Sequence, residues 1–207
     1  CGVNSQIVIL MAIIVSVFPI LLYLLLLIVL DCFALARWPM VVKCMFAGMF
    51  VCLVLWLLGK TVSFSIGIFS LMPLFEELFK GILLIYLIMG RRIRFMAEAM
   101  IYGAAIGGGF AILENIIYLC AVPEMHIATA VVRGLGAVLH IGSTALVSCL
   151  FILLMDGRHR VWLMITIAFI PSVIIHFACN ETNVSATYRM AAIIVLLFFM
   201  FLTLFKI

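Results

Sequence analysis

The chain has 207 residues, of which 69% are apolar and only 10% carry a charge. Soluble domains usually contain about 25% charged residues, so this composition excludes an ordinary soluble fold. The net charge of +4 does not indicate nucleic-acid binding, because most basic residues lie in short clusters between apolar runs, where they would set membrane topology.

Apolar runs long enough to cross a hydrocarbon core of about 30 Å as helices recur along the whole chain. The sequence therefore predicts an all-α, polytopic membrane helix bundle in the lipid bilayer. Strand barrels are excluded in practice, since no segment alternates apolar and polar residues. We expect about seven transmembrane helices, joined by short connections, in a single domain covering 1–207. The predicted spans are about 6–30, 41–58, 66–89, 99–121, 128–155, 161–180 and 189–206.

The connections between spans differ in charge. Basic residues gather in loops 31–43, 90–98 and 156–160 and at the C-terminus, whereas the alternate connections hold few of them. Because cytoplasmic loops carry an excess of lysine and arginine, we expect these basic segments in the cytoplasm. The predicted topology in the cell membrane places the N-terminus outside and the C-terminus inside.

Pro73 lies in the middle of the third apolar run. Inside a long helix it would remove one hydrogen bond and produce a kink. Alternatively, it is the first residue of a shorter helix, 73–89, because proline is favoured at that position. In that case Glu76 and Glu77 lie near a helix N-terminus, where the helix dipole favours negative charge.

Charged residues inside the predicted spans are the strongest functional signal. Each costs on the order of 3 kcal/mol at a span centre before any pairing. Such residues normally face a bundle interior, pair with one another and mark function. Two histidines and two asparagines accompany them. The full set is Glu76, Glu77, Lys80, Glu114, Asn115, Arg133, His140, His176 and Asn180.

Helical spacing and depth indicate that these residues meet. Spacings of four and seven place the polar residues of each span on one face. Counted from the predicted outer ends, the charged and histidine residues lie in the outer half of their spans or near the midplane. We therefore expect a polar active-site cavity in the outer half of the bundle. Lys80 is expected as a charge partner for a glutamate, and Arg133 as the counter-charge of Glu114 or Glu77.

Several intramembrane chemistries are excluded by the motifs they require. The chain lacks HExxH, a pair of intramembrane aspartates and GxSxG. A hydrolytic mechanism based on glutamate and histidine is compatible with the residues present. A carboxylate in a low-dielectric site can take a proton from water, and an amide with an imidazole N–H can stabilise an oxyanion. Glu76, His140, His176 and Asn180 would supply these groups.

Four blocks occur in order on successive spans: FEELFK, GFAILENIIY, RGLGAVLH and HFACN. Together they resemble the PrsW family of intramembrane proteases, which is related to the CAAX-prenyl endopeptidases and the bacteriocin-processing proteins. The blocks define a motif core over 75–180, about half of the chain. The resemblance implies hydrolysis of a peptide bond by water activated at a glutamate, with histidine assistance and without a metal or other cofactor.

The resemblance also implies individual roles. By position, Glu76 matches the catalytic glutamate and Glu77 its supporting neighbour. His140 matches the histidine that helps to hold the water, while His176 and Asn180 match the oxyanion-binding pair. The remaining positions are expected to support the site; they are Lys80, Glu114, Asn115 and Arg133.

PrsW-type proteases typically cut membrane-anchored anti-sigma factors on the extracytoplasmic side, which implies a single-span membrane protein as substrate and partner. Lys80 fits the PrsW version of the first motif, so prenylated substrates are disfavoured.

Two other functions are compatible with the same buried residues. A zinc protease could use Glu76, His140 and His176 as a His₂Glu ligand set. A proton-coupled transporter could use the same buried groups as a proton relay, although the chain has no internal repeat.

Overall fold

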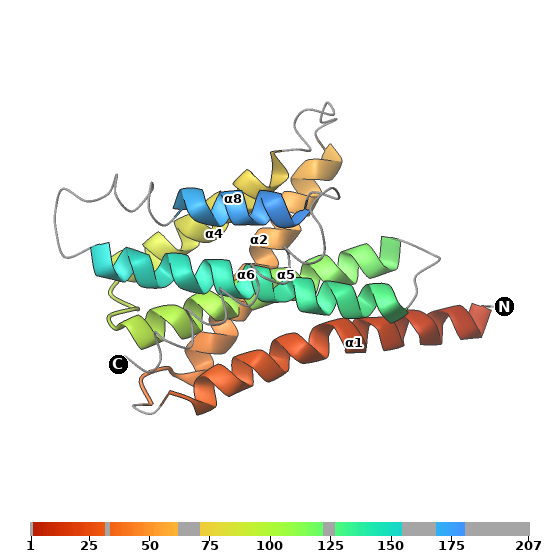
Figure 1. Ribbon diagram of the computed structural model, residues 1–207, viewed down its shortest axis with the longest axis horizontal. Helices are drawn as coiled ribbons and strands as arrows, with labels where there is room; N and C mark the ends of the chain where they lie inside the picture. The colour runs from red at the N-terminus through yellow and green to blue at the C-terminus, as the bar shows by residue number, and fades with distance from the viewer. Residues whose placement is uncertain (1, 32–33, 62–70, 122–126, 155–168, 181–207) are drawn as a thin grey trace.

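A computed structural model of the chain describes residues 2–31, 34–61, 71–121, 127–154 and 169–180 (Figure 1). Within these ranges every element is a helix, which confirms the predicted all-α class. The helices are α1 (Gly2–Val29), α2 (Trp38–Thr61), α4 (Met72–Met89), α5 (Met96–Ala121), α6 (Ile127–Leu154) and α8 (Ile170–Asn180).

Four of the described helices are long and apolar enough to cross a membrane, namely α1, α2, α5 and α6. The chain is therefore a multi-pass membrane protein. Helix α4 has 18 residues and carries three charged side chains, while α8 covers 11 residues, which is short of a full span. The predicted number of seven spans is not established, because 189–206 and part of 161–180 lie outside the described residues.

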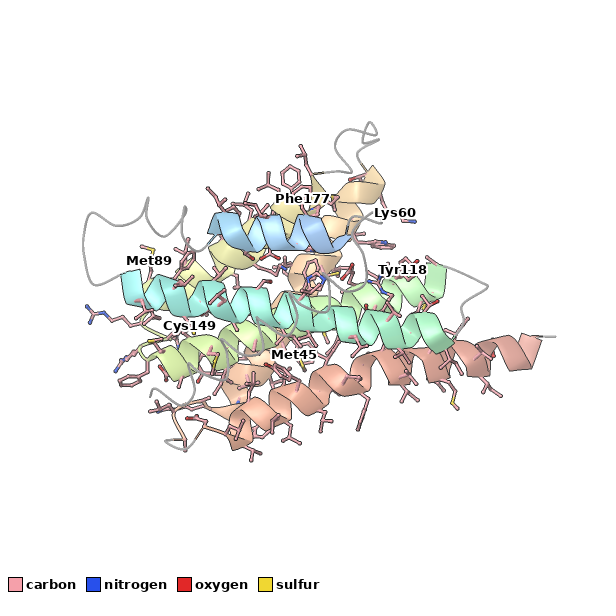
Figure 2. All side chains as sticks on the ribbon, viewed as in Figure 1. Met45, Lys60, Met89, Tyr118, Cys149 and Phe177 are labelled. Atoms are coloured by element: carbon pink, nitrogen blue, oxygen red, sulfur yellow. The ribbon has the colours of Figure 1, made fainter. Side chains whose placement is uncertain are left out.

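Helix α1 is apolar on all sides. Its inner face buries Ile20 and Leu24 against the bundle, while Leu10, Ile14 and Phe18 on the other side are more than half exposed. Figure 2 shows side chains projecting away from the bundle along the outer edge of this helix. A soluble monomer rarely exposes so continuous an apolar surface, so these side chains face lipid.

Helix α5 forms the centre of the bundle, and small residues let its neighbours approach closely. A Cβ atom added at Gly109 would overlap the backbone carbonyl oxygen of Met45 on α2, and one at Gly107 would overlap that of His140 on α6. Gly103 is similarly close to the backbone of Thr144 on α6. Gly103 and Gly107 form a GxxxG spacing, which is typical of close helix packing.

Helix α4 begins at Met72, one residue before the proline. Leu71 is the N-cap residue, and Pro73 occupies the first helical turn, where its missing N–H would be unsatisfied in any case. Of the two alternatives for Pro73, the structure therefore has the shorter helix that starts there. Glu76 and Glu77 lie just beyond its first turn, close to the positive end of the helix dipole.

Candidate functional site

The polar residues of α4, α5, α6 and α8 converge on one set of contacts between the helices, which we call the polar cluster. The site positions predicted on separate spans are thus brought together, with one serine that the sequence did not single out. The polar cluster comprises Glu76, Glu77, Lys80, Glu114, Asn115, Arg133, His140, Ser172 and His176.

Glu77 is the most heavily bonded carboxylate of the polar cluster. Its Oε1 accepts a hydrogen bond from Lys80 Nζ, one turn along the same helix, and lies 3.1 Å from His176 Nδ1. Its Oε2 accepts a hydrogen bond from the Ser172 hydroxyl. Glu77 and Lys80 are 3% and 1% exposed, so the pair is a buried ion pair whose other polar atoms are also bonded. These contacts lock Glu77 in place.

Glu76 differs sharply from its neighbour. Its Oε2 is buried and has no hydrogen-bond partner among the described residues. His176 Nε2 lies 3.6 Å from this oxygen, which is beyond hydrogen-bond distance. A buried carboxylate oxygen without a partner is costly, so this atom is available to bind a water molecule or a substrate group.

The two histidines lie edge to face, with ring centroids 4.7 Å apart and an interplanar angle of 89°. His140 Nε2 lies 3.1 Å from Glu114 Oε2, and its Nδ1 lies 3.4 Å from Lys80 Nζ. A proton on Nε2 satisfies both contacts, because the ring then donates to Glu114 and accepts from Lys80. Both nitrogens of His140 are therefore engaged with protein groups, whereas Nε2 of His176 is open towards Glu76.

Arg133 neutralises Glu114, one of its two expected partners. An Nη of Arg133 lies 3.1 Å from Glu114 Oε1, and its Nε donates to Asn115 Oδ1 at 2.9 Å. The guanidinium also stacks over the Tyr118 ring at 4.2 Å. These three contacts extend the polar cluster from His140 towards the C-terminal end of α5.

Asn180 is the last residue of α8, one turn after His176. Its side chain lies outside the described part of the structure, so its predicted oxyanion-binding role stays a prediction. Ser172 is the residue that sequence reasoning missed. Its spacing of four from His176 was a usable signal, because it places both side chains on one face of α8.

The donor types of the polar cluster fit a catalytic zinc site in part. One ligand atom each from Glu76, His140 and His176 lies within 4.8 Å of the other two, and His₂Glu is a known zinc ligand set. Bonds of about 2.1 Å in tetrahedral geometry would require these atoms to lie about 3.4 Å apart. A metal would therefore require the site to contract, and one nitrogen of His140 to leave Glu114 or Lys80.

We expect Glu77→Ala to destabilise the protein by about 3–5 kcal/mol, because it leaves the buried ammonium of Lys80 without its carboxylate. The double variant Glu77→Gln/Lys80→Met should recover much of this loss, since no unpaired charge stays buried. Thermal unfolding of the purified protein in detergent micelles measures both effects. Glu98→Ala, a partly exposed glutamate at the start of α5, is the control; an equal loss in the two alanine variants would contradict the prediction.

A family model for the PrsW family of intramembrane metalloproteases matches residues 9–205, which is nearly the whole chain. Searches of curated proteins and of solved structures gave no match.

Proposed function

The chain belongs to the PrsW family of intramembrane proteases, and we propose that it is an endopeptidase in which Glu76 activates the attacking water. The observation that carries this proposal is the contrast between two adjacent carboxylates. Glu77 is fully engaged by three side chains, whereas the buried Oε2 of Glu76 has no partner among the described residues.

The water is proposed to bind between Glu76 Oε2 and His176 Nε2. These atoms lie 3.6 Å apart, so one water oxygen can reach both at hydrogen-bond distance. Because the Glu77 carboxylate faces His176 Nδ1 at 3.1 Å, it favours the tautomer with the proton on Nδ1. Nε2 then carries a lone pair that accepts a hydrogen bond from the water and orients it.

Hydrolysis follows from these positions. Glu76 takes one proton from the water, and the water oxygen forms a bond to the carbonyl carbon of the substrate. The carbonyl π pair moves to its oxygen, giving a tetrahedral oxyanion. When the oxyanion collapses, the C–N bond breaks and Glu76 returns the proton to the leaving amine. Asn180 keeps its proposed place as an oxyanion donor.

His140 receives a different role in this proposal from the one its motif position implies. Both of its ring nitrogens face protein groups, so it positions Lys80, Glu114 and the neighbouring His176 ring. The water-holding role passes to His176. Lys80 keeps Glu77 charged and thereby fixes the orientation of His176.

The proposed substrate is a single-span membrane protein, for example an anti-sigma factor, cut near the extracytoplasmic surface. The basic loops support this side. Met89, next to the arginine-rich connection, lies at the opposite end of the molecule from Tyr118, which stacks on Arg133 (Figure 2). If the basic end faces the cytoplasm, the Arg133 end of the polar cluster faces outward. Membership in a protease family disfavours the transporter alternative.

A zinc-dependent protease is the second candidate, favoured by the donor atoms of Glu76, His140 and His176 within 4.8 Å and by the metalloprotease description of the family. A divalent metal held there would polarise the substrate carbonyl and acidify a bound water. We prefer the metal-independent mechanism, because both nitrogens of His140 already face protein groups: a metal would have to displace either Lys80 from Nδ1, at 3.4 Å, or Glu114 from Nε2, at 3.1 Å.

Metal content and activity separate the two candidates. We expect purified protein to contain substoichiometric zinc, and its cleavage of a single-span reporter in proteoliposomes to survive chelation. Elemental analysis and a gel assay before and after chelation make the measurement. One tightly bound metal per chain, together with activity that is lost on chelation and restored by Zn²⁺, would reject the metal-independent mechanism. Mass spectrometry of the fragments locates the cut relative to the membrane.

A further inference from the structure

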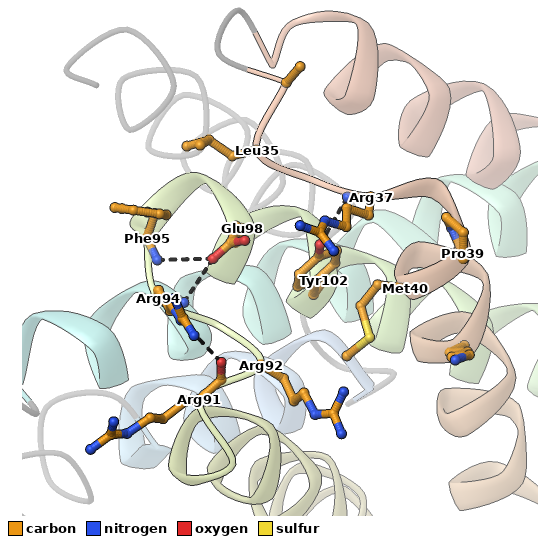
Figure 3. A pocket seen from close by; sticks show the side chains of 12 residues that line it. Leu35, Arg37, Pro39, Met40, Arg91, Arg92, Arg94, Phe95, Glu98 and Tyr102 are labelled. Atoms are coloured by element: carbon orange, nitrogen blue, oxygen red, sulfur yellow. Dashed lines mark hydrogen bonds between the residues drawn. The ribbon is translucent and has the colours of Figure 1, made fainter.

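A second polar feature lies at the other end of the bundle from Tyr118. A pocket of about 580 Å³ opens between the α1–α2 connection, the start of α2 and the α4–α5 connection (Figure 3). Among the described residues that line it, five are basic and one is acidic. The basic residues are Arg37, Lys43, Arg91, Arg92 and Arg94.

The charge of this basic pocket is not neutralised within the described part of the chain. None of the five basic side chains forms an ion pair there. The acidic residue, Glu98, is already engaged, because its Oε2 accepts hydrogen bonds from the backbone N–H groups of Arg94 and Phe95 at 2.8 and 3.2 Å. Figure 3 shows Glu98 turned towards these two residues. The pocket therefore attracts anions.

Tyr102 adds a directed hydrogen-bond donor to the basic pocket. The residue is 2% exposed, and its hydroxyl oxygen accepts the backbone N–H of Arg37 at 2.9 Å. Because that oxygen is the acceptor, the hydroxyl proton is left to donate to another group. A phosphate oxygen in the pocket could accept this proton alongside the guanidinium groups.

An apolar groove adjoins the basic pocket. It has a volume of about 450 Å³ and runs between α2 and α4, lined by apolar residues such as Ala47, Leu83 and Leu87. Met40, Lys43 and Arg92 line both the groove and the pocket. Because α2 is one of the helices long and apolar enough to span a membrane, this groove lies where acyl chains are found.

We propose that the pocket and groove together bind one anionic phospholipid. The phosphate of its headgroup would lie among Arg37, Lys43 and Arg92 with the Tyr102 hydroxyl, and an acyl chain would fill the groove beside Leu83. This binding does not depend on the proposed protease mechanism, since none of these residues belongs to the polar cluster.

The topological role of basic loops does not by itself explain this arrangement. The positive-inside rule requires only that lysine and arginine lie near the ends of the spans. It requires neither a concave pocket, nor a buried tyrosine with a free donor, nor a continuous apolar groove leading from the same cations. A bound phospholipid accounts for all three features.

Native mass spectrometry of the detergent-purified full chain, titrated with phosphatidylglycerol or phosphatidylcholine, tests the proposal. We expect preferential binding of phosphatidylglycerol. Each basic residue near an anionic lipid surface contributes about a fivefold change in affinity. Lys43→Gln should therefore weaken binding about fivefold, and Lys43→Gln/Arg92→Gln about 25-fold. The matched control is Lys60→Gln, which removes the same charge from the far end of α2 and should change nothing.

A third variant separates a lipid from a free phosphate. Ala47→Phe fills the groove without changing charge, so it should weaken lipid binding. On the unmodified chain, inorganic phosphate should compete poorly with the lipid. If inorganic phosphate displaces the lipid readily and Ala47→Phe has no effect, the ligand is a free phosphate and the groove assignment is overturned. Equal binding of the two lipids, or equal effects of Lys43→Gln and Lys60→Gln, would overturn the whole proposal. Thermal unfolding confirms that each variant is folded.

Discussion

Glu76→Gln is expected to lower the rate of reporter cleavage by about 10²- to 10⁴-fold, the range by which general bases contribute. The amide has nearly the shape of the carboxylate but cannot accept a proton from the water. Glu76→Asp keeps the acid and withdraws it by one methylene, so an intermediate rate is expected. Initial rates in proteoliposomes with a fixed reporter concentration provide the measurement.

Glu76→Gln should keep or gain stability while it loses activity. The Oε2 atom of Glu76 is buried without a partner in the described structure, so the native carboxylate is an unfavourable group, as the proposed role of a general base would require. A glutamine amide carries no charge, and its N–H₂ can donate to His176 Nε2. We expect a melting temperature equal to or above that of the wild type, in contrast to the large loss expected for Glu77→Ala.

Glu98→Gln is the matched control, because glutamine can still accept the backbone hydrogen bonds at the start of α5. It should leave both cleavage and melting temperature close to wild type. Full activity in Glu76→Gln would show that another group is the base. Loss of activity together with loss of folding would assign Glu76 a structural role instead.

How far the sequence could predict the contacts of the site depends on how many residues separate the two partners along the chain. Glu77 and Lys80 are three residues apart on one helix, so their pairing follows from local geometry. The contact between Lys80 and His140 joins residues 60 positions apart, and the bond from Ser172 to Glu77 joins residues 95 apart. Spacing predicts which side chains share a face, but only tertiary packing decides which faces meet.

In the fold, too, features set by local sequence could be predicted, whereas those set by tertiary packing could not. The hydrophobic runs predicted α1, α2, α5 and α6 to within a few residues, because length and apolarity suffice for a span. The sequence does not decide where α4 starts, since proline is compatible with both a kink and a helix start. The tautomer of His176 was also out of reach, because it depends on Glu77 facing one of two chemically similar nitrogens.

The second large effect is expected from a substitution at Gly107, where α5 packs on α6. A Cβ atom on Gly107 would overlap the carbonyl oxygen of His140 and crowd the Cα of Ile141. Both are backbone atoms, so no side-chain rotation relieves the overlap and the two helices must separate. We expect Gly107→Ala to cost about 1–3 kcal/mol of stability, as overpacking does. Movement of α6 would also carry His140 away from Glu114 and Lys80.

In Gly107→Ala we also expect a large loss of cleavage rate, beyond what the loss of stability alone would cause. A displacement of about 1 Å in catalytic geometry can lower a rate about 10²-fold, and the His176 ring packs directly on His140 at 4.7 Å. We therefore expect kcat/KM per folded molecule to drop by about that factor in Gly107→Ala. The comparison with Gly109→Ala is informative, because its added Cβ would overlap Met45 on α2 and leave α6 in place. That variant should lose stability but keep its rate per folded molecule.

Gly136→Ala completes the series. Among the described residues, no atom outside the neighbouring turns of α6 lies within 4 Å of a Cβ added at Gly136, so the substitution meets open space there. Alanine in a helix is favoured over glycine by up to about 1 kcal/mol, and stability should stay constant or rise. Melting temperatures and kcat/KM, corrected for the folded fraction, are measured for all three variants. Equal losses of corrected rate in Gly107→Ala and Gly109→Ala would mean that any disturbance of the packing around α5, rather than the position of His140, lowers the rate of cleavage.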